Sequence, residues 1–189
     1  MMSSRKLPKF TTEYSATKYK PGFKVESNNS GIGTVLGRSP TNAGRFIIKF
    51  DTTGTVKEFD RVALGNGAFY DPFAPTVCGI GFLGEGSYSR ASHKKEYTLW
   101  SSMIDRCYSG RDSRKHYSDC SASKEWHNFQ IFCKEVVDLP NYKLWKFTKH
   151  YELDKDILNR DARVYSKDTC QFVTVKENRE EKTGMRYNK

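Results

Sequence analysis

The hydrophobic pattern of this 189-residue chain changes its period along the sequence, and this change limits what the chain can fold into. Between residues 20 and 60, short apolar pieces alternate with polar residues and are separated by glycine-containing turns, which is typical of β-strands. After residue 90, large apolar residues recur three or four positions apart, which is typical of amphipathic helices. The sequence therefore predicts an α+β protein with a β-rich part followed by a helical part.

The β-rich part is predicted to contain four strands, at residues 23–26, 33–36, 45–50 and 56–59. In the third strand, Phe46, Ile48 and Phe50 should share one face, because side chains alternate along a strand. Ile47 and Lys49 should then lie on the other face. Several short strands within about 45 residues predict a small twisted sheet or barrel of the SH3-like kind.

Changes in composition divide the chain into three predicted parts. Residues 1–20 are polar and basic without periodicity, which indicates a flexible tail. Residues 21–86 form the β-rich module, and residues 87–189 form a helical and C-terminal domain. The module ends in a glycine run (79–86) that lacks the Lys-Ser/Thr ending of a nucleotide-binding loop, so we interpret the run as a flexible hinge.

Two amphipathic helices are predicted after the hinge. The first covers residues 93–108 and places on one face Tyr97, Trp100, Met103, Ile104, Cys107 and Tyr108. The second covers residues 123–137, ends before Leu139-Pro140, and is predicted to pack its aromatic face on the first. Strands at 151–158 and 170–174 and a short charged helix at 175–182 then predict a compact ββα unit.

The charge balance indicates the kind of partner. The chain has a net charge of +10, which favours nucleic acid or an anionic lipid surface as the partner. Interleaved tyrosines favour nucleic acid, although a basic surface that only confers solubility is the alternative. No apolar run approaches the roughly 18 residues of a membrane span, and the N-terminus has no apolar segment typical of a secretory signal. The predicted nucleic-acid contacts are Arg90, Lys94, Lys95, Arg106, Arg111, Arg114, Lys115, Arg160 and Arg163.

The five cysteines are far apart in the sequence, and we interpret them as free thiols of a protein kept in the cytosol. A zinc site normally contains a C-x2-4-C pair, and the chain has none. A set made of Cys107, His116, Cys120 and His127 is the alternative. Zinc is therefore not the metal that we expect.

Oxygen ligands occur in the predicted ββα unit. Asp154 and Asp156 are two residues apart, so a regular strand would place both on one face. Asn178, on the following helix, could fold back toward that strand. A carboxylate with an amide oxygen suits a hard cation such as Mg²⁺. The alternative is that both acids are ordinary surface residues paired with Lys155 or Arg163.

The C-terminal half resembles phage-encoded HNH endonucleases and HNH-like proteins over about residues 97–178. The motifs that carry the resemblance are YTLWSSMIDRCY at 97–108, WHNFQIF at 126–132, LDKDIL at 153–158, YSKDTCQFV at 165–173 and EN at 177–178. The segment DPFAPTVCGIGFLG at 71–84 also resembles one that accompanies phage HNH-type proteins. The resemblance implies a DNA endonuclease in the cytoplasm of the host cell, with DNA as substrate and a host nucleic-acid enzyme as a second partner. It also implies that Asp154 and Asn178 hold one Mg²⁺ or Mn²⁺ ion.

The chain departs from the HNH pattern at two positions. The general-base histidine of the family falls at Lys155 and its central asparagine falls at Thr169. A lysine is cationic at neutral pH, so it is a poor base for activating water. His150, four residues before Asp154, is the leading substitute, and Asp156 is another. The alternatives are a metal-bound hydroxide that needs little help, or an inactive unit retained to bind DNA or a host factor.

Overall fold

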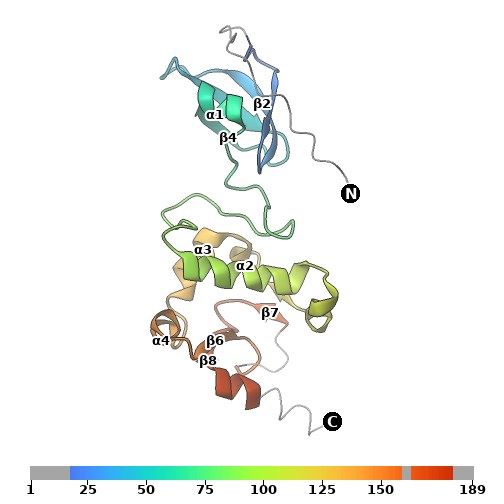
Figure 1. Ribbon diagram of the computed structural model, residues 1–189, viewed down its shortest axis with the longest axis vertical. Helices are drawn as coiled ribbons and strands as arrows, with labels where there is room; N and C mark the ends of the chain where they lie inside the picture. Colours follow the sequence, from blue (N-terminus) through green and yellow to red (C-terminus); the bar gives the residue numbers. More distant parts are fainter. Residues whose placement is uncertain (1–17, 159–162, 181–189) are drawn as a thin grey trace. The chain divides into compact units, whose positions relative to one another are not determined.

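The computed structural model describes residues 18–158 and 163–180. The chain divides into two compact units, residues 1–74 and residues 75–189, and each unit is described by itself (Figure 1). The glycine-rich segment at 79–86, which the sequence assigned to the end of the first module, belongs to the second unit. Within the described ranges, no helix combines the length and the apolar character that crossing a membrane requires.

The first unit contains a four-stranded antiparallel sheet and one short helix. In sheet order, the strands are β1 (Lys24–Ser27), β2 (Gly31–Arg38), β3 (Arg45–Phe50) and β4 (Val56–Asp60). All four predicted strands are thus confirmed, with small shifts at their ends. The helix α1 (Arg61–Asn66) follows β4 directly and was not predicted, because it carries a single buried residue and so has little apolar periodicity.

The faces of β3 are those that the alternation predicts. Phe46, Ile48 and Phe50 are buried, whereas Lys49 is exposed and Ile47 is half-buried. The inward-facing side chains form the core of the unit together with Tyr19, Val25, Val35, Phe59, Leu64 and Phe69. The period of two therefore identified the buried face of the sheet correctly.

The helix α1 contacts both β1 and β4, which are the two edge strands of the sheet. The sheet of the first unit is therefore curled around this helix. Asp60 caps α1 by accepting a hydrogen bond from the Ala63 N–H at 2.8 Å. Gly67 ends the helix with a φ of 65°, in the left-handed region that favours glycine. The Gly67 carbonyl then accepts a hydrogen bond from the Asn28 N–H at 2.9 Å, which ties the end of β1 to the helix.

The second unit is mainly helical and carries two small sheets. Its elements are α2 (Lys94–Tyr108), the 3-10 turn η1 (Asp112–Tyr117), β5 (Ser121–Ala122), the 3-10 turn η2 (Glu125–His127), α3 (Phe129–Val136), α4 (Tyr142–Phe147), β6 (Tyr151–Asp154), β7 (Val164–Tyr165) and β8 (Gln171–Thr174). Residues 175–180 are helical, and the rest of the helix predicted at 175–182 lies outside the described residues. β5 pairs with β7 in parallel, and β6 pairs with β8 antiparallel.

The predicted packing of aromatic faces forms the core of this unit. The rings of Trp100 on α2 and Phe129 on α3 lie 5.3 Å apart, and the Trp100 indole N–H donates to the Trp126 carbonyl at 2.7 Å. Trp145 on α4 stacks on Phe172 of β8 at 4.8 Å. The core therefore joins the helices to the β6–β8 ribbon, which is drawn below α2 and β7 in Figure 1.

The second predicted helix is interrupted. Asn128 has an extended backbone, with φ −90° and ψ 117°, and separates η2 from α3. Its side chain caps α3 by accepting from the Gln130 N–H at 2.9 Å, and the neighbouring backbone pairs with Phe82. A capping residue within a continuous apolar stripe leaves no break in the hydrophobic period, so the sequence pattern did not show the interruption.

The glycine run packs against the helices of its own unit, in contrast to the flexible hinge that the sequence suggested. A Cβ at Gly81 would lie 2.9 Å from the Trp100 ring. Gly84 has a φ of +72°, and a Cβ there would overlap the Asn128 side chain. The Phe82 N–H donates to the His127 carbonyl at 2.9 Å. These glycines therefore allow close backbone approach.

Candidate functional site

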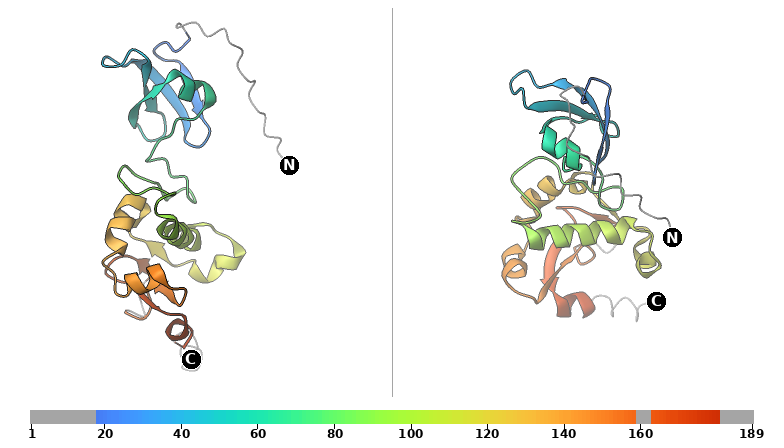
Figure 2. Two further views of the ribbon diagram at one scale, coloured as in Figure 1. Left: turned by 60° about the vertical axis from the view of Figure 1, so that its left-hand side comes forward. Right: turned by 45° about the horizontal axis from the view of Figure 1, so that its top comes forward.

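The β6–β8 ribbon and the helix after it position the candidate site. Glu152 lies opposite Val173 and Asp154 lies opposite Gln171, so both acids project from the same face of the ribbon. Leu153 projects from the other face into the core. The helix at 175–180 follows β8 without a break and lies next to the ribbon (Figure 2).

Asp154 is buried and ends the strand β6. Its Oδ2 accepts hydrogen bonds from the N–H groups of Asp156 at 2.9 Å and Ile157 at 2.8 Å. This turn explains why the strand predicted to reach residue 158 stops at Asp154. Because the backbone after the turn no longer alternates, Asp154 and Asp156 do not share a strand face, and that prediction was wrong.

Asn178 reaches back from the helix to the ribbon. Its Nδ2 donates to Glu152 Oε2 at 2.9 Å, and its side chain is 4% exposed. Its Oδ1 is buried without a hydrogen-bond partner, which costs about 1–3 kcal/mol when nothing fills the position. Glu152 was not among the predicted site residues, although its spacing of two from Asp154 was a signal that could have identified it.

The donor atoms at this place fit a hard cation. Asp154 provides a carboxylate held by its turn, and the Asn178 Oδ1 provides an orphaned amide oxygen on the element that covers the same face. Within the described ranges, no three His, Cys, Asp or Glu side chains are grouped to hold a metal. A site with two protein oxygens takes its other ligands from water and substrate, as Mg²⁺ sites often do.

Lys155, which the HNH resemblance would place at the general-base position, is buried and forms an ion pair with Asp156. Burial lowers the pKa of the ammonium, but the hydrogen bond to Asp156 and the nearby charges of Asp156, Cys120 and Asp154 together raise it, and the net effect is a raised pKa. The Nζ also lies over the Tyr165 ring, 5.7 Å from its centroid. A fixed cation of this kind cannot accept a proton from water near neutral pH.

His150 and Asp154 lie at opposite ends of β6, whereas the predicted role of His150 as a base requires the two residues to be close together. His150 is exposed and precedes β6, and its carbonyl accepts from the Val175 N–H at 2.9 Å. Four residues of extended chain separate two Cα atoms by about 13 Å. His150 instead lines a shallow depression with Thr174, Val175, Lys176, Arg179 and Glu180.

Four of the nine predicted nucleic-acid contacts are paired with carboxylates in the structure. Arg111 and Arg114 both bind Asp105, at 3.0 and 3.2 Å, and the Asp105 side chain is only 16% exposed. Lys115 pairs with Asp112 at 3.1 Å, and Arg163 pairs with Asp119. The formal net charge of the chain counts these cations in full, so it overstates the positive charge that this stretch offers to a polyanion.

The remaining predicted contacts have different surroundings. Lys95 donates to the carbonyls of Lys146 at 3.0 Å and Thr148 at 3.1 Å, so it caps α4 and is not a surface cation. Arg106 lies over the Tyr117 ring at 5.9 Å. A second shallow depression contains Arg90, Lys94, Tyr97 and nearby α2 residues, with the Arg90 guanidinium 5.0 Å from the Tyr97 ring centroid. Arg160 lies outside the described residues.

The β6–β8 ribbon and the helix after it therefore carry two hard oxygen donors, Asp154 and Asn178, and a buried fixed cation, Lys155, while the basic depression is a separate surface next to that helix. These groups suit the binding of a divalent cation and of anionic oxygens. Comparison of the chain with protein-family models, with curated proteins and with solved structures finds no match.

Proposed function

We propose that the second unit contains an HNH-like ββα unit that hydrolyses phosphodiester bonds of DNA with one Mg²⁺ or Mn²⁺ ion. The observation that supports this most directly is the buried Asn178 Oδ1 without a partner, on a helix that covers the Asp154 face of the ribbon. The resemblance to HNH proteins assigns the metal-binding role to the same two residues. The β6–β8 pairing followed by a helix agrees with that assignment.

Under this proposal, each residue of the site has a defined task. When bound, a metal ion would supply the positive charge that polarises the scissile phosphate and stabilises the leaving oxygen. Asp154 and Asn178 hold the ion, and Glu152 orients the Asn178 amide so that its oxygen is available. Lys155 supplies fixed positive charge beside the phosphate. Asp156, with a side chain 27% exposed, is the carboxylate able to orient the attacking water.

We also propose that the first unit is an SH3-like module that helps to hold DNA. Its curled four-stranded sheet, closed by α1 across both edges, supports the comparison with a small barrel. Basic side chains on its strands, such as Lys24 and Lys49, are exposed. Lys24 is paired with Asp51 at 2.6 Å, so Lys49 is the better candidate for a phosphate contact.

A second candidate function is a DNA-binding or host-factor-binding protein without catalytic activity. The observation that favours it is Lys155, a buried and ion-paired ammonium where HNH enzymes carry a base. Thr169, at the position of the family's central asparagine, donates to the Val164 carbonyl at 2.6 Å and so serves the local turn. Binding without cleavage would follow from these two replacements.

A plasmid-relaxation assay distinguishes the two functions. Supercoiled DNA is incubated at low salt with Mg²⁺ or Mn²⁺, with and without EDTA, and with the variants Asp154→Asn and Asn178→Ala. Asp154→Asn keeps an oxygen that can accept the two turn hydrogen bonds, so it tests the charge and not the fold. Asp168→Asn, an exposed carboxylate in the same unit, is the matched control.

Nicking that EDTA and both site variants abolish, while the control variant retains it, would support the endonuclease. DNA binding without nicking, on phage and host genomic DNA as well as on plasmid, would support the binding protein. Nicking that survives Asp154→Asn would refute the assignment of the metal ligands.

A further inference from the structure

We infer that the depression lined by His150, Thr174, Val175, Lys176, Arg179 and Glu180 binds the phosphodiester backbone of a DNA strand beside the candidate metal site. This inference rests on the proposed function, because it assigns the substrate's flanking phosphates to a surface next to that site. It also gives His150 a new role, as a phosphate contact and not as a general base.

The helix at 175–180 separates the depression from the candidate metal ligands. Lys176, Arg179 and Glu180 are three and four residues apart, so they share one side of the helix. Asn178 is two residues from Lys176, about 200° around the helix, and its amide contacts Glu152 on the ribbon. Lys176 and Glu180 therefore lie on the opposite side of the helix from Asn178, and Arg179 lies about 100° around the helix from it. The helix is about 10 Å across, which equals roughly three nucleotide rises of one strand.

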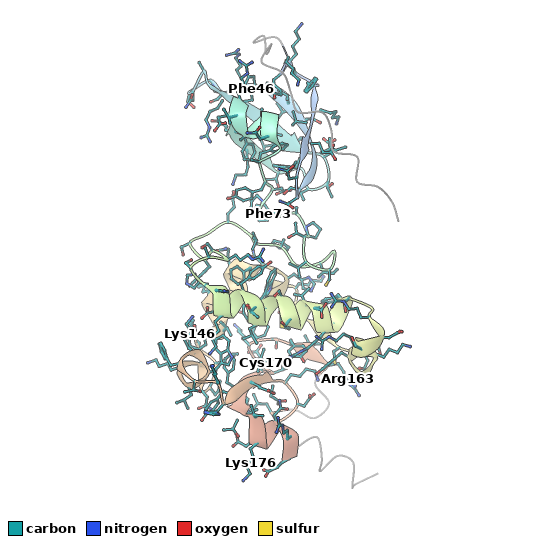
Figure 3. All side chains as sticks on the ribbon, viewed as in Figure 1. Phe46, Phe73, Lys146, Arg163, Cys170 and Lys176 are labelled. Atoms are coloured by element: carbon teal, nitrogen blue, oxygen red, sulfur yellow. The ribbon has the colours of Figure 1, made fainter. Side chains whose placement is uncertain are left out.

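The positive charge of Lys176 is available to a ligand. Lys176 is 83% exposed, and its nearest carboxylate, Glu180, is 3.8 Å away and 66% exposed. An ion pair so open to solvent is worth about 0–1 kcal/mol, so a phosphate can replace it. Figure 3 shows Lys176 on the helix that follows β8. This surface differs from the stretch at 90–115, where Asp105 holds two arginines.

The neighbouring acid Glu177 keeps its negative charge beside the depression, and Lys176 and Arg179 together outweigh it. Its Oε2 accepts hydrogen bonds from the N–H and the hydroxyl of Thr174, at 2.8 and 2.7 Å, so its charge is held at the start of the helix. Arg179 adds a planar group that can bind two phosphate oxygens at once. Glu180 is the one carboxylate among the residues that line the depression.

The test measures binding of a fluorescently labelled DNA duplex by anisotropy, in EDTA so that no cleavage occurs, between 50 and 300 mM salt. The variant Lys176→Ser/Arg179→Ser removes two proposed phosphate contacts. The control Lys134→Ser/Lys143→Ser removes the same net charge from exposed positions on α3 and α4. Circular dichroism and thermal melting establish that both variants are folded.

We expect the Lys176/Arg179 variant to bind about tenfold or more weakly at low salt, and its slope of log affinity against log salt to fall by about two. The control should change the affinity by less than about threefold. Equal losses in the two variants, or no DNA binding by the wild-type protein, would overturn the inference. Inorganic phosphate at low millimolar concentration should not displace the duplex, and displacement would indicate a site for the free anion instead.

His150→Gln provides a second readout. As a phosphate contact, His150 should contribute to DNA affinity, so His150→Gln should raise the dissociation constant for DNA measured in EDTA. A slower saturated rate with unchanged affinity would identify it as the base and overturn this role. A protein that never cleaves DNA, but loses affinity in the Lys176/Arg179 variant, would retain the inference and refute the proposed endonuclease.

Discussion

The Asn178 amide nitrogen donates to the Glu152 carboxylate at 2.9 Å, and this contact joins the helix after β8 to the face of the ribbon that carries Asp154. The contact also fixes which end of the amide points toward Glu152, because a carboxylate accepts and does not donate. The Asn178 oxygen is consequently left buried and without a partner. The polar atom of Asn178 that is left to bind a cation is therefore the side-chain oxygen, and not an N–H group.

Asn178→Asp should make the stability of the protein depend on divalent metal. The substitution replaces a donor to Glu152 with a second carboxylate, so without metal we expect a loss of about 1–3 kcal/mol. Mg²⁺ or Mn²⁺ should restore part of that loss, because the new charge favours a cation. Thermal melting with metal and with EDTA measures both effects. A variant that metal does not stabilise would argue against an ion at this place.

Lys155 and Asp156 should be energetically coupled. Removing one partner of a buried ion pair leaves an uncompensated charge. We therefore expect Lys155→Met to lower the free energy of unfolding by about 2–4 kcal/mol. This loss is smaller than for a fully buried pair because the Asp156 side chain is partly exposed. In Lys155→Met/Asp156→Asn, most of this loss should be recovered. Urea unfolding of the two single variants and the double variant gives the coupling free energy, and strictly additive losses would contradict a direct pair.

The buried carboxylate of Glu96 should contribute a pH-dependent stability. It accepts from the Tyr142 hydroxyl and the Lys146 ammonium, each at 2.5 Å. Burial opposes its charge, but these two hydrogen bonds lower its pKa below the ordinary value. A lowered folded-state pKa means that the stabilisation is complete above about pH 4.5 and is lost as the pH falls through the folded pKa.

We therefore expect Glu96→Gln to lower the free energy of unfolding at pH 7 by about 2–3 kcal/mol, and by less at pH 3. Urea titrations of the wild-type protein and the variant across this range measure the difference. Asp138→Asn, an exposed carboxylate elsewhere in the unit, is the control. A difference between wild type and Glu96→Gln that stays constant from pH 7 to pH 3 would contradict the assignment.

Gly84 and Gly79 form a matched pair that tests the packing of the glycine run. Both have a positive φ, +72° and +71°, but only at Gly84 would a Cβ meet another group, the Asn128 side chain. We expect Gly79→Ala to cost about 1–2 kcal/mol for its backbone conformation alone. Gly84→Ala should cost about 1–3 kcal/mol more because it displaces the cap of α3. Equal and small losses of stability in the two variants, measured by thermal unfolding, would instead indicate that the glycine run is a flexible hinge.

The cysteines should react with thiol reagents in two classes. Cys78 is exposed, although partial desolvation raises the pKa of its thiol, whereas Cys133 and Cys170 are buried and burial raises their pKa to about 12. At pH 8 the native protein should therefore show fast labelling at Cys78, which Cys78→Ser removes, and slow labelling at the buried thiols. All five should react in urea. Fast native labelling of Cys170 would show that the β8 region opens readily.

Local sequence patterns predicted the regular elements with large apolar faces. Alternation identified the buried side of β3, and the three-to-four spacing identified α2 with Trp100 and Met103 inside. The short helices α1 and α4 and the two-residue strands β5 and β7 were missed. Each contains too few residues to complete a hydrophobic period, so its structure depends on contacts with distant parts of the chain.

Sequence also indicated the candidate ligands Asp154 and Asn178, through residue chemistry and the HNH resemblance, but it did not indicate what surrounds them. The Glu152 contact of Asn178 joins residues 26 positions apart, and the buried position of Glu96 depends on Lys146, which is 50 positions away. The same holds for the basic residues, since Asp105 neutralises two arginines that the net charge counts as free.

The sequence by itself thus determined the two kinds of structure, the faces that become buried and the oxygen chemistry of the candidate site, because these depend on near neighbours along the chain. Only the tertiary structure decided which cations are paired, that Lys155 is a fixed charge, and that His150 lies with Lys176 and away from Asp154. Pairing and burial depend on distances between groups that are far apart in sequence, and folding alone sets those distances.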